Sequence, residues 1–231
     1  MKKLELKTVL YSVVQHEKDY SYYQGLNFIT ELFYVEYGML RAYLIMDALA
    51  HYMFSSFMAG TKTFDDSLNK RITYSHIILQ EEIQHFEEII SFDAGLTAKD
   101  KSMHRLNFAV SWFLTLFAYK INDHQVILRI FDFLICCLNP YGISYVVAAV
   151  LKTMFESKGI NKHSDKGEVM ALVFNGNFND VDFDKVINRA FELMNKPEYQ
   201  LTELEKKADK MNKISLVKNL GGKLFSFFGK K

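Results

Sequence analysis

The chain has 231 residues, of which 49% are hydrophobic and 24% charged, so it is long enough to bury a substantial core as one domain or two closely packed ones. Its 28 Lys and Arg residues nearly balance its 27 Asp and Glu residues, and the net charge of +1 provides no global field that would attract a polyanion. We therefore expect no nucleic-acid partner.

The two cysteines, Cys136 and Cys137, are adjacent within an apolar run, which argues against a disulfide framework and favours a reducing compartment. The longest strongly apolar stretch, residues 108–119, is shorter than the ~18 to 20 residues that a membrane span needs. We therefore expect a cytoplasmic protein without a secretory or transmembrane segment.

Apolar residues recur along the chain at spacings of three and four, and only two prolines and 11 glycines interrupt them, which predicts an all-α fold. Several of these helices have recognisable ends. Three are predicted to end at Gly38, Gly60 and Pro140, and another to begin at an N-cap, Asn122 or Asp123. In chain order, the expected helices are 26–37, 39–57, 74–92, 108–119, 125–138, 143–155 and 183–194. The composition becomes more polar beyond Gly159, so we divide the chain into a helical core at 1–158, a smaller helical part at 159–212 and a tail at 213–231.

Two patterns stand out in the predicted core. The first is Ser21-Tyr22-Tyr23-Gln24-Gly25-Leu26-Asn27, and the second is Ser111-Trp112-Phe113-Leu114-Thr115-Leu116-Phe117 with Arg129-Ile130-Phe131-Asp132 after it. Together they resemble the TBC domain of Rab GTPase-activating proteins, which carries Tyr-x-Gln-Gly-(Met/Leu)-Asn and, later, Trp-Phe-Leu-Thr-Leu-Phe and an Arg-x-(Trp)-Asp segment. Phe131 stands where the family usually has Trp. The resemblance implies a multi-helix TBC-like bundle and a Rab-family small GTPase as the partner.

The resemblance assigns the catalytic role to Gln24, a glutamine finger that positions water in the partner, with Tyr22 ordering the finger. Gly25 would allow close approach of the backbone to the partner, although a glycine before a helix is also ordinary turn chemistry. Asn27 belongs to the same motif and is assigned to partner binding or structural support. Such an activator needs no cofactor of its own, because the GTPase binds both GTP and Mg²⁺.

The second pattern is given a supporting role. A helix with Trp112 among other aromatic and aliphatic residues is typical of core packing. Arg129 and Asp132 lie three residues apart, so they are expected to form a local pair or to brace the finger.

The family places a catalytic arginine in an Ile-x-x-Asp-x-x-Arg segment before its glutamine, whereas the first arginine in this chain is Arg41. Two hypotheses follow. Either the chain is an N-terminally shortened form of a longer activator, or it is a non-catalytic TBC-like module that binds a GTPase or serves as a scaffold. Whether it acts catalytically is left open at this point.

Glu82-x-x-His85 has the spacing with which a helix offers two metal ligands, but the chain has no second copy of it. The other histidines show no ligand spacing, and they are His16, His51, His76, His104, His124 and His163. We therefore expect no metal site. The tail at 213–231 combines lysines with Leu220, Leu224, Phe225, Phe227 and Phe228 and has no acidic residue. This composition suits a peripheral contact with endomembranes, and a disordered end or a last helix docked on the domain is equally left open.

Overall fold

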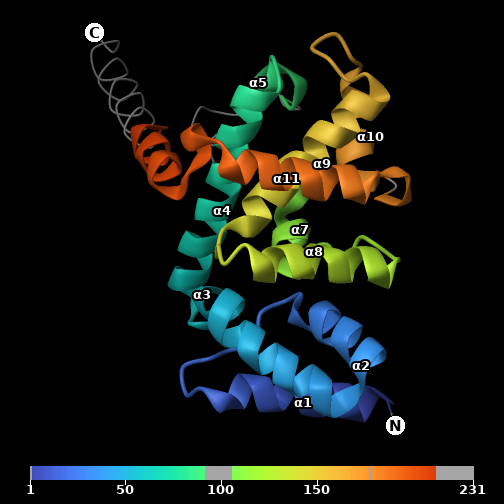
Figure 1. Cartoon of the computed structure of the whole chain (residues 1–231), viewed down its shortest axis with the longest axis vertical. Helices are drawn as coiled ribbons and strands as arrows, with labels where there is room; N and C mark the ends of the chain where they lie inside the picture. The colour runs from blue at the N-terminus through green and yellow to red at the C-terminus, as the bar shows by residue number, and fades with distance from the viewer. Residues whose placement is uncertain (1, 92–105, 177, 212–231) are drawn as a thin grey trace, which may run out of the picture.

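The computed structural model describes residues 2–91, 106–176 and 178–211, and these residues form helices and connecting turns without any strand (Figure 1). The predicted all-α class is therefore confirmed. The elements are α1 (Lys2–His16), α2 (Leu26–Leu49), a π-helix η1 (Ala50–Phe54), α3 (Ser55–Met58), α4 (Thr61–Glu82), α5 (Phe86–Ile89), η2 (Asn107–Ala109), α7 (Val110–Thr115), α8 (His124–Cys136), α9 (Gly142–Lys158), α10 (Lys166–Asn175), η3 (Phe178–Asp180), α11 (Phe183–Asn195) and η4 (Pro197–Tyr199), followed by a helical segment at 201–211. None of the described helices is both long and apolar enough to cross a bilayer.

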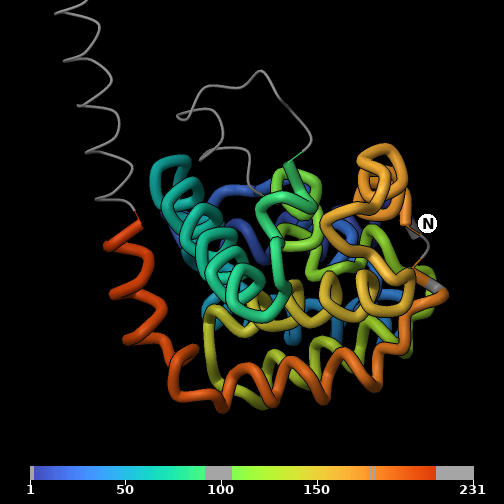
Figure 2. The backbone as a smooth tube through the Cα atoms, turned by 90° about the horizontal axis from the view of Figure 1, so that it is seen from above, coloured from blue at the N-terminus to red at the C-terminus, as the bar shows by residue number. Residues whose placement is uncertain are grey.

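The centre of the fold is α9, whose residues 142–151 are all buried. It packs against α4, α7 and α11, and Figure 2 shows it lying inward of α11. Small and β-branched residues such as Val146, Ala148 and Ala149 let these neighbours approach on every side. A helix that is apolar all round is stable only when it is enclosed in this way.

The N-terminal part is built on α1 and α2, which lie against each other at one end of the molecule (Figure 1). Val9 and Val13 on α1 are buried in the core. Gly38 interrupts α2 with φ 76° and ψ 173°, which confirms the predicted break at this residue. Its conformation is one that residues with a Cβ rarely adopt.

Two of the predicted helices end earlier than expected. The helix expected at 108–119 is α7, which ends at Thr115 because Leu116 and Phe117 adopt φ values of 47° and 68°. The helix expected at 74–92 is α4, which begins earlier at Thr61 and ends at Glu82, and His85 at φ 59° separates it from α5. Apolar spacing does not distinguish one long helix from two helices in the same phase, so the sequence could not show these breaks.

The α8 helix begins as predicted. The Asp123 side chain accepts hydrogen bonds from the backbone N–H groups of Gln125 (2.9 Å) and Val126 (3.4 Å), so the N-cap is Asp123 rather than Asn122. On α2, the Glu36 carboxylate lies 2.8 Å from Nδ1 of His124 and thereby joins the two helices. The apolar spacing does not predict α1 or α10.

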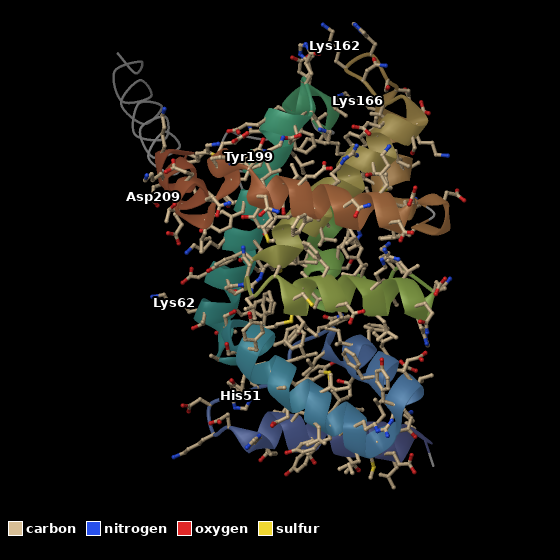
Figure 3. All side chains as sticks on the ribbon, viewed as in Figure 1. His51, Lys62, Lys162, Lys166, Tyr199 and Asp209 are labelled. Atoms are coloured by element: carbon tan, nitrogen blue, oxygen red, sulfur yellow. The ribbon has the colours of Figure 1, made fainter. Side chains whose placement is uncertain are left out.

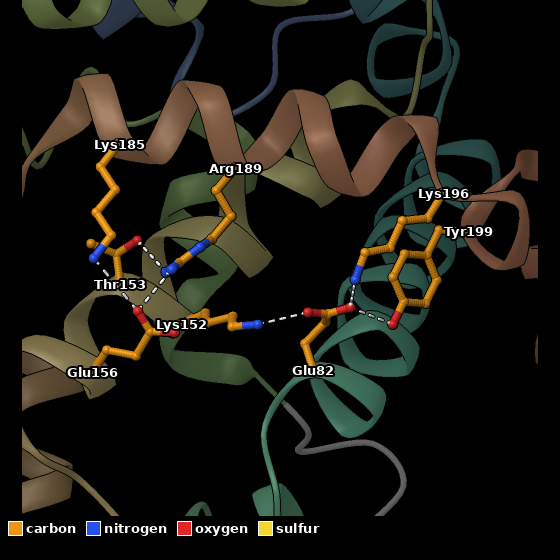
Figure 4. Close-up of polar contacts among 8 residues, drawn as sticks. All are labelled: Glu82, Lys152, Thr153, Glu156, Lys185, Arg189, Lys196 and Tyr199. Atoms are coloured by element: carbon orange, nitrogen blue, oxygen red, sulfur yellow. Dashed lines mark hydrogen bonds and ion pairs between the residues drawn. The ribbon is translucent and has the colours of Figure 1, made fainter.

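A partly buried carboxylate joins the C-terminal helices to α4 (Figure 4). Glu82 accepts hydrogen bonds from Lys152 of α9 (2.7 Å), from Tyr199 of η4 (2.8 Å) and from Lys196. Burial raises the pKa of the Glu82 carboxyl, but these three donors outweigh it and lower the pKa to about 2. The ionised Glu82 is therefore one of the contacts that hold α4, α9 and the chain after α11 together.

We expect Glu82→Gln to lower the free energy of unfolding by about 2 kcal/mol at neutral pH, because two lysines lose their partly buried counter-charge. The folded pKa of about 2 lies below the ordinary 4.5, so the contribution of Glu82 is complete above the ordinary value and is lost as the pH falls towards 2. Chemical unfolding of both proteins between neutral and acidic pH should show the difference shrinking below about pH 5.

Glu81→Gln is the matched control, because Glu81 is the exposed neighbour and pairs with Lys207 at 2.7 Å. This substitution should cost less than about 1 kcal/mol. An equal cost for the two substitutions, or a Glu82→Gln cost that does not change with pH, would contradict the assignment.

Candidate functional site

The segment that joins α1 to α2 presents Gln24 to solvent between two buried neighbours. Tyr23 is only 5% exposed, and its ring lies among Phe54, Phe57 and Phe64 with centroid separations of 6.1, 5.5 and 6.2 Å. Gly25 is also buried, whereas Tyr22 and Gln24 are exposed. The alternation means that the packing of Tyr23 and Gly25 fixes the backbone on both sides of the Gln24 amide.

A second anchor holds the beginning of the segment. The backbone N–H of Ser21 donates to the carbonyl oxygen of Met58 at 2.8 Å, and the Ser21 hydroxyl donates to the same oxygen at 3.0 Å. Met58 is the last residue of α3, so the segment is tied to the end of that helix.

Gly25 is where the two sequence patterns meet. Its φ of 119° is one that side-chain-bearing residues rarely adopt. A Cβ at this position would lie 3.1 Å from Cγ2 of Thr115 and 3.3 Å from the carbonyl oxygen of Leu114. The close approach that requires a glycine is therefore made to α7 of the same chain.

Hydrogen bonds of Thr115 hold the end of α7, against which the Gly25 backbone packs. The Thr115 hydroxyl donates to the carbonyl oxygen of Ser111 at 2.7 Å and accepts from the backbone N–H of Tyr119 at 3.4 Å. The ring of Tyr119 lies on Phe28 of α2, with centroids 4.9 Å apart. The structure thus brings together two segments that lie about ninety residues apart in the sequence.

Tyr22 and Asn27 bracket the glutamine. The Tyr22 hydroxyl donates to Oδ1 of Asn27 at 3.0 Å, although the Tyr22 side chain remains 51% exposed. Tyr22 also lines a shallow apolar groove along α1 with Leu10, Tyr11 and Val14. The hydrogen bond closes a small loop around Gln24, which restrains the amide without covering it.

Trp112 has the packing role expected for it. The side chain is fully buried, and its ring meets those of Phe108, Phe117 and Phe178 at 5.7, 5.5 and 5.1 Å between centroids. Trp112 therefore supports α7 from behind and does not reach the surface.

Arg129 and Asp132 do not form the expected local pair. Nη1 of Arg129 lies 2.8 Å from Oδ1 of Asp184, which joins α8 to α11 at the surface. Asp132 is exposed. Exposed ion pairs contribute about 0 to 1 kcal/mol, so Arg129 is a minor structural contact.

Sequence reasoning missed Arg71, a buried arginine on α4. Its guanidinium donates to the carbonyl oxygens of Pro140 (3.0 Å) and Ser67 (3.2 Å) and lies 4.4 Å from the centroid of the Phe57 ring. Burial lowers the Arg71 pKa to about 10, the nearby Tyr141 and Tyr23 acting in the opposite direction. Phe57 also packs on Tyr23, so Arg71 stabilises the aromatic cluster that holds the Gln24 segment in place. No spacing in the sequence marks this residue.

The histidines are arranged differently from the expectation. Glu82 is occupied by Lys152, Lys196 and Tyr199, and His85 lies beyond the end of α4 with its Nδ1 3.1 Å from Glu88, so Glu82-x-x-His85 does not present two ligands on one helix. His16 and His51, which show no ligand spacing in the sequence, lie with ring centroids 5.4 Å apart. His104 and the tail at 213–231 lie outside the described residues.

Comparison with known proteins gives a match over most of the chain. The family model of the Rab-GTPase-TBC domain matches residues 1–158, and this match ends at the last residue of α9. The chain is also similar to the GTPase-activating protein gyp10 of Schizosaccharomyces pombe (strain 972 / ATCC 24843), with 27% identity over 147 residues. The aligned region covers 64% of this chain and 36% of the yeast protein, so the chain spans little more than a third of that relative.

We expect Gly25→Ala to destabilise the fold by about 3 kcal/mol, because an unfavourable φ adds to the overlap of the new Cβ with α7. Gly159→Ala is the matched control, since Gly159 has φ 65° with open space around a Cβ. This control should cost about 1 kcal/mol. Unfolding in urea measures both values, and equal costs would show that the contact of Gly25 with α7 contributes nothing.

Proposed function

Because the chain belongs to the Rab-GTPase-TBC domain family, we propose that it is a GTPase-activating protein for a Rab-family small GTPase. The observation that carries this proposal is the exposed Gln24 amide, held between buried Tyr23 and buried Gly25. In the proposed complex, Gln24 enters the nucleotide site of the GTPase and acts there in trans.

GTP hydrolysis requires the activator mainly to position groups around the γ-phosphate. Transfer of the γ-phosphoryl group to water depends on orienting the attacking water and stabilising the charge on the phosphoryl oxygens. An amide has an oxygen that accepts from the water and an N–H group that donates to a phosphate oxygen. GTP and Mg²⁺ are held by the GTPase, so the activator needs no cofactor of its own for this step.

The surroundings of Gln24 support this role. The anchors at Ser21, Tyr23 and Gly25 reduce the entropy that is lost when the segment enters another protein. The neighbouring groove on α1, with exposed Tyr11 and Tyr22, supplies apolar surface of the kind that interfaces use. We propose that this groove contacts the GTPase beside its nucleotide site.

The proposal also concerns a second catalytic group, the arginine that the TBC family supplies besides its glutamine. An arginine supplied to the phosphoryl group contributes about 10³ to 10⁵ in rate, but residues 1–23 contain no arginine. Arg71 is buried beneath the Gln24 segment, and its guanidinium is occupied by backbone carbonyls. Without an arginine in the complex, Gln24 should accelerate hydrolysis only weakly.

The engagement of Arg71 by backbone carbonyls favours a second candidate function, in which the domain binds a GTPase or serves as a scaffold without activating hydrolysis. In both cases we propose action in vesicle traffic, where the family operates. The tail at 213–231 is the part of the chain that we propose for contact with endomembranes, from its lysines and phenylalanines.

Single-turnover hydrolysis by a panel of GTP-loaded Rab proteins tests the activator. We expect one or more Rab proteins to respond, and Gln24→Ala to reduce the stimulated rate about tenfold or more, because the water loses its positioning group. Binding of the GTP-loaded Rab, measured by biolayer interferometry, should stay within about threefold, since the groove and the fold are unchanged.

Gln84→Ala is the matched control, because Gln84 is an exposed glutamine between α4 and α5. Figure 1 shows α5 at the other end of the molecule from α1. This substitution should leave the rate unchanged. Binding without stimulation would assign the non-catalytic function. If no Rab binds or responds, both candidate functions are wrong for this polypeptide.

A further inference from the structure

A cluster of histidines and carboxylates lies where the segment that carries Gln24 leaves α1. His16 is the last residue of α1 and Glu17 follows it, while Asp47 is in the last turn of α2 and His51 is in the π-helix. Figure 3 places His51 on the part of the molecule that contains α1 and α2. Three elements of the fold therefore contribute to one cluster.

The ligand-type atoms of this cluster are close together. One nitrogen of His16, one nitrogen of His51 and one carboxylate oxygen of Asp47 all lie within 4.8 Å of one another. Nδ1 of His16 contacts Oδ1 of Asp47 directly, and Nδ1 of His51 lies 2.9 Å from the Asp47 carbonyl oxygen. Zinc binds nitrogen and oxygen at ~2.0 to 2.2 Å, so in the proposed site the three side chains rotate to face one shared ion.

We propose that His16, Asp47 and His51 bind a divalent transition-metal ion, with Zn²⁺ as the best fit. Two imidazoles and one carboxylate form a donor set that suits zinc and its neighbours and does not suit Mg²⁺ or Ca²⁺, which prefer oxygen ligands. Asp47 and His51 lie four residues apart, so the helix presents them on one face, and His16 completes the set from another helix. The ligands are partly exposed, which leaves a fourth position for water.

Glu17 supplies an independent feature that points to a metal. Its Oε1 lies 3.0 Å from Nε2 of His51, on the opposite side of the ring from the nitrogen that faces Asp47. Metal-binding histidines usually donate their second ring N–H group to a carboxylate or carbonyl, which fixes the tautomer and orients the ring. With Asp47, Glu17 also balances the charge of a divalent ion.

The local backbone is unusual at the same place. The turn that contains His51 is a π-helix, Ala50–Phe54, between α2 and α3. Such turns are rare and occur frequently at functional sites, because the extra residue changes the direction in which side chains project. Here the π-helix begins directly before His51.

The position of the site gives the metal a structural consequence. A bound ion would link the end of α1 to the end of α2. The Gln24 segment begins directly after the end of α1. The ion would therefore stabilise the base from which that segment extends. The inference stands on its own geometry and does not depend on GTPase activation.

Isothermal titration of the chelator-treated full chain with ZnCl₂ tests the site. We expect one Zn²⁺ per chain and a rise in the thermal midpoint, because an ion that binds only the folded state stabilises it. Co²⁺ in place of Zn²⁺ should give the visible absorption of a four-coordinate site with nitrogen and oxygen ligands.

Variants locate the ion. His51→Ala and His16→Ala should each weaken Zn²⁺ binding by at least about a hundredfold, and Glu17→Gln, which acts through His51, by about tenfold. His163→Ala is the control, because His163 is exposed in the turn between α9 and α10, outside the cluster. Circular dichroism of each metal-free variant shows whether it is folded.

The proposal is overturned if the parent chain binds no Zn²⁺ at millimolar concentration, which needs no variant to interpret. It is also overturned if folded His16→Ala and His51→Ala bind Zn²⁺ as tightly as the parent. In either case the cluster is a set of histidine–carboxylate hydrogen bonds only.

Discussion

The contact between Gly25 and the end of α7 is the constraint on which the rest of the functional end depends. Because no side chain lies between them, the backbone of the first sequence motif rests directly on the second. This contact sets where α2 begins and which residues of the joining segment face inwards. Tyr23 and Gly25 become buried, and Gln24 between them is left in solvent.

Different forces hold the two ends of the molecule. Around Gln24, aromatic packing dominates, with Tyr23 among three phenylalanines and buried Arg71 below them. At the other end, a network of ion pairs joins α4, α9 and α11 through Glu82 and through Glu156, whose carboxylate meets Arg189 at 2.7 Å (Figure 4). The ion pairs around Glu82 and Glu156 depend on carboxylates that stay charged. The end that carries Gln24 also has titratable contacts, because His16 meets Asp47 and His51 meets Glu17 there.

The sequence predicted the fold class, the break at Gly38, the N-cap before His124 and the packing role of Trp112, because these depend on local spacing and local chemistry. It did not predict the end of α7 at Thr115, where Leu116 adopts a left-handed conformation, or the end of α4 at Glu82, where Ile83 is extended. Both residues carry ordinary side chains that do not mark a helix end. At the site, the Tyr22 to Asn27 motif and its family were visible in the sequence. The sequence did not show the partners of Arg129, Arg71 and His16. Each partner lies far away in the chain, and only the tertiary structure brings it next to its residue.

Trp112 is the single tryptophan of the chain, and it lies fully buried on α7, within the helix that supports Gly25. Its indole therefore serves as an intrinsic optical probe of the region behind the Gln24 segment. An indole enclosed by three phenylalanine rings emits at short wavelength, and loosening of that enclosure moves the emission towards the red. The packing that supports the exposed amide can thus be followed by fluorescence without attaching a label.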